Sequence, residues 1–162
     1  MYRILLVDDD QNIVDGLGSI IKQNFENIFV ISSACDGSDA LNRLTEDYYH
    51  VIISDIRMPK LTGLDVVKQA REQGYKGKVI ILSGFTDFKY AQSAIRYGVE
   101  YYLTKPIDED ELYETVSAIS SQINKEAKEE ETLSNYRDIV ELQQAEAFGA
   151  LMAVFLWIYG IV

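Results

Sequence analysis

Hydrophobic and polar positions follow two alternating periods along the first 123 residues. Short apolar runs, each the length of a β-strand, are separated by stretches in which apolar residues recur every three or four positions, as in an amphipathic helix. The runs predict five strands, over 3–7, 28–32, 51–54, 79–82 and 100–103. The helical stretches after them have their first apolar positions at Ile13, Ala40, Leu64, Phe88 and Leu112.

Five strand–helix units in about 120 residues predict an α/β fold with a doubly wound, five-stranded parallel sheet. The runs 3–7, 51–54 and 79–82 are almost continuously apolar, as expected of strands that are covered on both faces. Right-handed crossovers and this size favour the flavodoxin-like strand order 2-1-3-4-5. In that order the first and third strands are neighbours, and a ligand is expected in the crevice at their carboxyl ends.

The pattern changes after residue 123. Residues 124–131 are almost all polar, whereas residues 147–162 carry no charge. We therefore predict two parts, a domain over 1–123 and a C-terminal helical extension over 124–162 that serves as a linker or dimerisation tail. Positions with a spacing of three and four from Leu133 to Ile161, most of them apolar, resemble a coiled-coil seam.

Three interpretations of residues 147–162 stay open. A helix that is apolar on all sides requires burial, which favours a dimerisation or inter-domain helix. A membrane-associating tail is the second, although 16 residues are fewer than a membrane span needs and no basic residue flanks them. An unnatural end of the sequence is the third.

Composition narrows the function. The chain of 162 residues has 15 Lys and Arg against 26 Asp and Glu, a net charge of −11. Such acidity argues against a surface that binds nucleic acid or an anionic membrane. A single cysteine, Cys35, excludes an internal disulfide framework. The apolar run at the N-terminus is too short for a signal peptide, and we expect a cytoplasmic protein.

The polar residues at the strand ends predict the chemistry. The first strand ends in Asp8, Asp9 and Asp10, the third in Asp55, the fourth in Ser83 and the fifth in Thr104, Lys105 and Pro106. Carboxylates this close repel one another unless a cation lies among them, and Mg²⁺ suits oxygen ligands. An aspartate, Mg²⁺, a lysine and a hydroxyl together are suited to phosphoryl transfer onto a carboxylate.

The same residues carry a family resemblance. The segments LLVDDD (5–10), VIISDIRMPKLTGLDVV (51–67), IILSGFTD (80–87) and EYYLTKPID (100–108) resemble, in order and spacing, the receiver domain of two-component response regulators. The resemblance covers residues 1–123. The stretch from Ser83 to Ile107 is similar to receivers that precede an AraC-type helix-turn-helix output domain, and no such domain follows in this sequence.

The resemblance implies roles for the residues at the strand ends. Asp55 would be the phosphoacceptor, Asp9 a direct Mg²⁺ ligand, and Asp8 a partner that reaches the metal mainly through water. Arg57 would give its backbone carbonyl to the metal. Asp10 is expected to cap the helix that begins near Gln11.

Three further positions complete the implied machinery. Ser83 and Lys105 would bind phosphoryl oxygens, and Ser83 with Tyr102 would form the switch. The Lys105–Pro106 bond matches the family's cis-peptide position. Phe85 lies at the rim of the site, where a large apolar side chain would slow hydrolysis of the phosphoryl group.

We therefore expect a signalling switch, not an enzyme in the usual sense, that takes a phosphoryl group from a sensor histidine kinase and assists its own phosphotransfer and dephosphorylation. The expected partners are that kinase and a second copy in a homodimer, with no direct contact to DNA by this segment. Two alternatives remain: a haloacid-dehalogenase-like phosphatase that uses Asp8 and Asp10, and a phosphorylation-independent scaffold. His50 is expected to be an ordinary surface loop residue.

Overall fold

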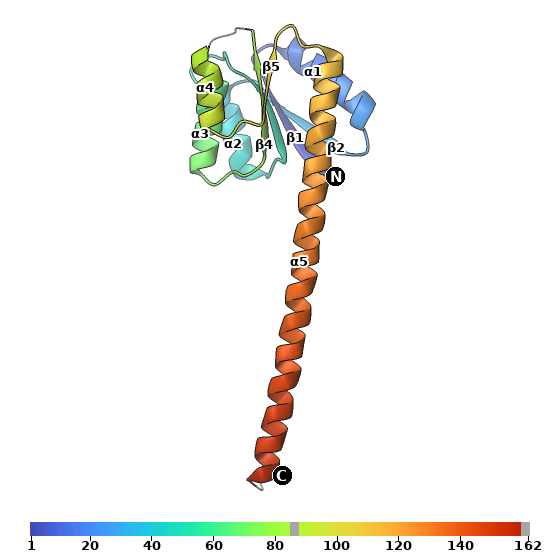
Figure 1. Ribbon diagram of the computed structural model, residues 1–162. Coiled ribbons are helices and arrows are strands. Elements are labelled where there is room, and N and C mark those ends of the chain that lie inside the picture. The colour runs from blue at the N-terminus through green and yellow to red at the C-terminus, as the bar shows by residue number, and fades with distance from the viewer. Residues whose placement is uncertain (85–87, 160–162) are drawn as a thin grey trace. The chain divides into compact units, whose positions relative to one another are not determined.

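A computed structural model describes residues 1–84 and 88–159, and it contains the predicted parallel sheet. The strand order is β2-β1-β3-β4-β5, which confirms the predicted flavodoxin-like topology, and all neighbouring strands are parallel (Figure 1). The strands are β1 (Tyr2–Val7), β2 (Phe29–Ala34), β3 (Val51–Asp55), β4 (Lys78–Ser83) and β5 (Tyr101–Thr104). The helices are α1 (Gln11–Phe25), α2 (Gly37–Glu46), α3 (Gly63–Glu72), α4 (Phe88–Arg96) and α5 (Glu109–Ile158).

Helices cover both faces of the sheet within residues 1–120. Figure 1 shows α2, α3 and α4 on one face and α1 with the first turns of α5 on the other. The central strands β1, β3 and β4 are buried almost completely, because both faces of each are covered. Two apolar clusters lie between the sheet and helices α2 to α4, and they include Leu5, Ile52, Val66, Val67 and Ile81.

Polar side chains fix where the helices begin. The side chain of Asp10 accepts a hydrogen bond from the backbone N–H of Asn12, so this residue caps α1 as predicted. Thr62 and Asp65 form a reciprocal capping box at the start of α3. The Asp10 cap starts α1 shortly after the end of β1, whereas a loop of seven residues separates the end of β3 from α3.

The chain divides into two compact units, Met1–Ser120 and Ser121–Val162. Within the described residues, the second unit is formed by the remainder of α5, a single helix. Its side chains are almost all exposed. The predicted boundary at residue 123 stays a prediction.

Arg71, near the end of α3, holds together the loops at the amino ends of two strands. Its guanidinium donates to the carbonyl oxygens of Tyr75 and Gly77 before β4, at 2.9 and 2.8 Å. It also donates to the carbonyl oxygens of Tyr97 and Gly98 before β5, at 3.2 and 2.9 Å. One side chain therefore satisfies four loop carbonyls at the end of the sheet opposite to the site.

His50 lies in the loop before β3, as predicted, and its side chain makes specific contacts there. Its Nδ1 accepts a hydrogen bond of 3.0 Å from the backbone N–H of Arg3, and its ring lies edge-on to Tyr2 and Tyr48. The side chain is only partly exposed. Burial lowers the pKa of His50, and the positive charges of the N-terminus and Arg3 lower it further.

Candidate functional site

The register of the sheet brings the predicted site residues together at one edge. Val7 on β1 pairs with Ser54 on β3, so the next residues, Asp8 and Asp55, lie side by side. On the other side of β3, Ser83 is the last residue of β4, and its carbonyl oxygen accepts a hydrogen bond of 2.7 Å from the backbone N–H of Lys105. Four strand ends thus deliver two carboxylates, a hydroxyl and an ammonium group to one place.

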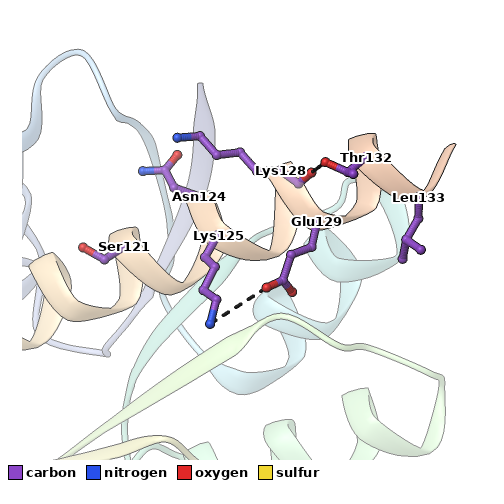
Figure 2. Close-up of a pocket in the computed structure, with 7 residues that line it drawn as sticks. All are labelled: Ser121, Asn124, Lys125, Lys128, Glu129, Thr132 and Leu133. Carbon is purple, nitrogen blue, oxygen red and sulfur yellow. Dashed lines mark hydrogen bonds and ion pairs between the residues drawn. The ribbon is translucent and has the colours of Figure 1, made fainter. Parts of the chain in front are cut away.

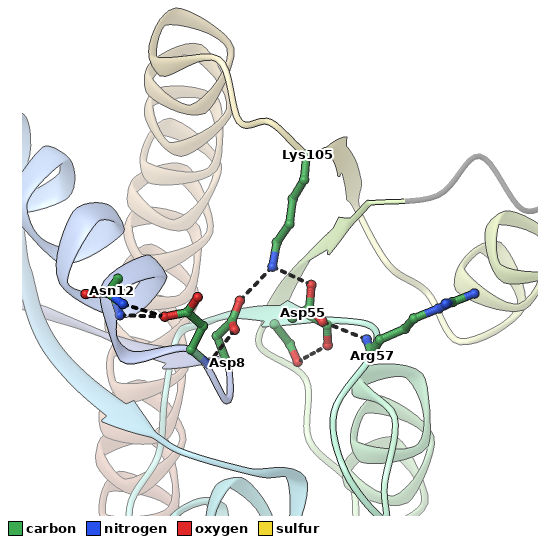
Figure 3. A network of polar contacts seen from close by, with 7 residues as sticks. Asp8, Asn12, Asp55, Arg57 and Lys105 are labelled. Atoms are coloured by element: carbon green, nitrogen blue, oxygen red, sulfur yellow. Dashed lines mark hydrogen bonds and ion pairs between the residues drawn. The ribbon is translucent and has the colours of Figure 1, made fainter.

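The Lys105 ammonium group lies between the two carboxylates, as Figure 3 shows. Its Nζ is 2.6 Å from Oδ1 of Asp55 and 2.8 Å from Oδ2 of Asp8. The side chains of Asp8 and Asp55 are 3% and 9% exposed, whereas that of Lys105 is 24% exposed. Two buried negative charges therefore share one partly exposed positive charge, which leaves the cluster with an excess negative charge.

Burial and charge act on the titration of this cluster in opposite directions. Burial raises the pKa of Asp55 above its ordinary value, and the hydrogen bond and charge of Lys105 reduce this rise without cancelling it. Burial acts to lower the pKa of Lys105, but its hydrogen bonds to Asp55 and Asp8 outweigh that effect and raise it. Lys105 is therefore an ammonium group at neutral pH.

The remaining carboxylate oxygens are held by the backbone. Oδ2 of Asp55 accepts from the backbone N–H of Arg57 at 2.7 Å, and Oδ1 of Asp8 accepts from the backbone N–H of Asp10 at 2.9 Å. Both side chains are thus fixed by two contacts each (Figure 3). A fixed orientation is what a carboxylate needs in order to act as a positioned nucleophile or ligand.

The loop after Asp55 packs closely against the end of β3. A Cβ atom on Gly63 would overlap the backbone carbonyl oxygen of Asp55, so only glycine fits at this position. Lys60 has a positive φ of 68°, and the backbone N–H of Leu61 donates to the carbonyl oxygen of Pro59 across it at 2.8 Å. This is a γ-turn of the strained type, and it directs the chain back toward the site.

The other predicted site residues lie around this cluster. Asp9 is exposed, and the side chain of Arg57 is exposed as well. Tyr102 is partly buried and packs against the apolar cluster that contains Ile81 and Ala94. The Lys105–Pro106 peptide bond is cis. Phe85, predicted to lie at the rim, falls outside the described residues.

The donor set fits a hard divalent cation in its chemistry. Asp8 and Asp55 supply buried carboxylate oxygens with an excess negative charge, and Asp9 follows directly in the chain. Within residues 1–84 and 88–159, however, no three His, Cys, Asp or Glu side chains are grouped as ligands for a metal ion.

One contact at the site was not predicted from the sequence, which indicates it only weakly. Ser54, fully buried, donates its hydroxyl to the carbonyl oxygen of Asp55 at 3.0 Å. A serine within the apolar run 51–54 is the feature that could have indicated it. Its hydroxyl also lies next to Gly63, so it helps to define the close packing behind Asp55.

Comparison with known proteins identifies relatives of this arrangement. The family model of the response regulator receiver domain matches residues 4–117. The uncharacterized transcriptional regulatory protein YesN of Bacillus subtilis is 31% identical over 150 residues, which are 93% of this chain and 40% of that protein. The transcriptional regulatory protein HptR of Staphylococcus aureus is 34% identical over 69% of this chain and 44% of its own length.

Solved structures agree in fold. The receiver domain of AraT, a response regulator from Geobacillus stearothermophilus, is 34% identical with a TM-score of 0.70, covering 78% of this chain and 98% of that one. The N-terminal domain of an uncharacterized protein from Wolinella succinogenes is 37% identical with a TM-score of 0.70, covering 79% and 99% of the two chains. The present chain spans about two-fifths of the length of the curated relatives named above.

Proposed function

We propose that Asp55 is the residue that accepts a phosphoryl group, because the chain belongs to the response regulator receiver domain family. The observation that carries this assignment is the position of Asp55, buried at the end of the central strand β3 with its Oδ1 2.6 Å from Lys105. The receiver domain is the signalling part of a two-component system, and a phosphorylation-activated switch is its function.

In the proposed reaction, a carboxylate oxygen of Asp55 attacks the phosphorus of a phosphohistidine on a sensor kinase. The P–O bond to Asp55 forms as the P–N bond to the histidine breaks, and the imidazole leaves with the electron pair. Lys105 keeps its proton and balances negative charge on the transferring oxygens, as its raised pKa supports. Ser83, at the end of β4, would donate a hydrogen bond from its hydroxyl to a phosphoryl oxygen.

Asp8, Asp9, Asp55 and the backbone carbonyl of Arg57 are the groups that we propose to hold Mg²⁺. When bound, the ion would neutralise charge on the phosphoryl oxygens and reduce the repulsion between the carboxylates. The excess negative charge of the cluster around Lys105 supports this assignment.

The output of the switch is proposed to run through Ser83 and Tyr102. Their strands are adjacent, since Ser83 pairs with Thr104 and Ile81 pairs with Tyr102. A displacement of Ser83 toward a phosphoryl group would therefore reach the partly buried Tyr102 ring and the surface beside α4.

The wider setting is also a proposal, because this chain matches less than half of the length of either relative. We infer that the receiver acts in the cytoplasm as the regulatory part of a homodimeric transcription regulator with an AraC-type output domain. Contact with DNA would belong to that output domain.

The test is phosphorylation by acetyl phosphate with Mg²⁺, followed by intact-mass measurement and peptide mapping. We expect one phosphoryl group on Asp55 in the wild type, none in Asp55→Asn, and normal labelling in the matched control Asp10→Asn. Labelling that persists in Asp55→Asn would refute the assignment. Rapid phosphate turnover that depends on Asp8 and Asp10 would instead favour a phosphatase.

A further inference from the structure

The second part of α5 changes from a charged to an uncharged surface along its length. Figure 2 shows polar side chains between Ser121 and Leu133, where Lys125 and Glu129 form an i,i+4 ion pair of 3.8 Å. Such a surface is stable in water. From Ala147 to its end at Ile158 the helix carries no charged side chain, and neither does the following Tyr159.

The apolar side chains of residues 147–159 surround the helix. Phe148 is 66% exposed and Trp157 is 80% exposed. They are nine positions apart, and at about 100° per residue they lie on opposite sides of the helix. Leu151, Val154 and Ile158, all more than half exposed, lie on the surface between them.

A second copy of the helix could not cover this surface. A two-stranded coiled coil buries a narrow seam of two positions in seven, and it leaves the opposite side in water. If Trp157 lay in such a seam, Phe148 would remain exposed, and the reverse holds as well. An environment that encloses the whole helix is required.

We propose that residues 147–159 insert into a lipid bilayer and tether the receiver domain to a membrane surface. The uncharged surface matches the hydrocarbon interior of a bilayer. Among the described residues, α5 is long and apolar enough to cross a membrane by length and composition, with an 18-residue stretch of mean hydropathy 1.4 that is not buried. Trp157 and Tyr159 are of the type that favours the boundary between lipid and water.

The charges near the segment predict which lipids it binds. Residues 138–159 contain Asp138, Glu141 and Glu146 and no lysine or arginine. Binding should therefore be driven by apolar contact with the acyl chains and should gain nothing from anionic headgroups. This separates the proposed insertion from the usual binding of basic amphipathic helices.

The single tryptophan of the chain, Trp157, reports directly on the insertion. The full chain is reconstituted from mild detergent into phosphatidylcholine vesicles with or without phosphatidylglycerol, and the vesicles are floated on a density gradient. We expect the chain to float equally with both lipids and its fluorescence to be quenched several-fold more by lipids brominated on the acyl chain than by unbrominated lipids.

A matched pair of variants provides the control. Leu151→Glu with Phe155→Glu places two charges within the apolar segment and should abolish flotation and quenching. Thr132→Glu with Asn135→Glu adds the same charge to exposed positions outside the segment and should leave both unchanged. Labelling of Asp55 by acetyl phosphate should be equal in all three proteins, which shows that the receiver domain is intact.

Three results would overturn the proposal. They are failure of the wild type to float, flotation without quenching by brominated lipid, and equal flotation of the Leu151→Glu, Phe155→Glu variant. Flotation without quenching would place Trp157 outside the acyl chains. Because Asp55 labelling is measured separately, these results leave the proposed phosphorylation unaffected.

Discussion

Replacing Lys105 by methionine removes the ammonium group that lies between the carboxylates of Asp8 and Asp55. Methionine keeps an unbranched side chain of similar length, so most of the apolar stem of the lysine is replaced. The variant leaves two carboxylates, 3% and 9% exposed, without the cation that lies 2.8 and 2.6 Å from them. The fold is therefore expected to lose stability at neutral pH.

The size of the expected stability loss follows from the burial of the two carboxylates and the lysine. Removing one partner of a buried ion pair costs roughly 3–5 kcal/mol. The Lys105 side chain is 24% exposed, so water screens part of the interaction and can reach the carboxylates after the substitution. We expect a loss of about 2–3 kcal/mol in the free energy of unfolding at pH 7, which corresponds to roughly 5–10 °C in Tm.

The loss should depend on pH. Without the lysine, burial and the charge of Asp8 raise the pKa of Asp55 in the folded variant still further above its value in the unfolded chain. The folded variant then binds more protons than its unfolded state, so its stability falls as pH rises through this window. The difference between wild type and variant is expected to be small near pH 4 and largest at pH 7.

The assay is thermal and urea unfolding in EDTA at several pH values, with Lys68→Met as the control. Lys68 is an exposed residue of α3, and its replacement should change stability by less than about 0.5 kcal/mol. Adding Mg²⁺ should restore part of the loss in Lys105→Met, because a cation among the carboxylates stabilises the folded state. Equal stability of Lys105→Met and wild type at pH 7 would refute the idea that this ion pair compensates buried charge.

Three further outcomes can be measured. Gly63→Ala should lose at least about 2 kcal/mol of unfolding free energy and be phosphorylated more slowly, because its Cβ overlaps the carbonyl oxygen of Asp55; normal stability and labelling would contradict this. Lys60→Val should be about 1 kcal/mol less stable than Lys60→Gly, because φ is 68° at this position; urea unfolding would show equal midpoints if the turn were relaxed. The folded-state pKa of His50 lies below its unfolded value, so stability is lost as pH falls below about 6.5. Relative to the wild type, His50→Gln should lose less stability between about pH 7 and pH 5, and parallel curves would show that His50 does not titrate differently on folding.

The sequence predicted the central strands of the sheet because a local pattern of apolar residues marks each of them. The strands β1, β3 and β4 are buried on both faces, so their apolar runs are continuous and their ends are marked by the polar residues of the site. The strand β2 lies at an edge of the sheet, and its burial is incomplete. It runs two residues beyond the predicted end at Ser32, since a weak apolar pattern fixes its limits less well.

The sequence could place the site residues at one end of the sheet, but it could not predict their contacts. That Asp8 and Asp55 follow neighbouring strands comes from topology. That the Lys105 ammonium bridges both of them depends on partners 97 and 50 positions away, and no local pattern reports such distances. The hydrogen bond of His50 could not be predicted for the same reason, because its partner Arg3 is 47 positions distant.

The four carbonyl contacts of Arg71 bear on how a signal could travel through the receiver. They anchor the start of β5 and the end of α4 to α3, whereas Ser83 lies at the opposite end of the sheet. If α4 and β5 are held at the Arg71 end and displaced at the Ser83 end, they rotate about the held end. We therefore expect α4 and β5 to tilt rather than slide when Asp55 is phosphorylated, with the largest displacement at the amino end of α4. Arg71→Ala removes these four contacts. It should weaken the coupling between phosphorylation and output while leaving Asp55 fully able to accept the phosphoryl group.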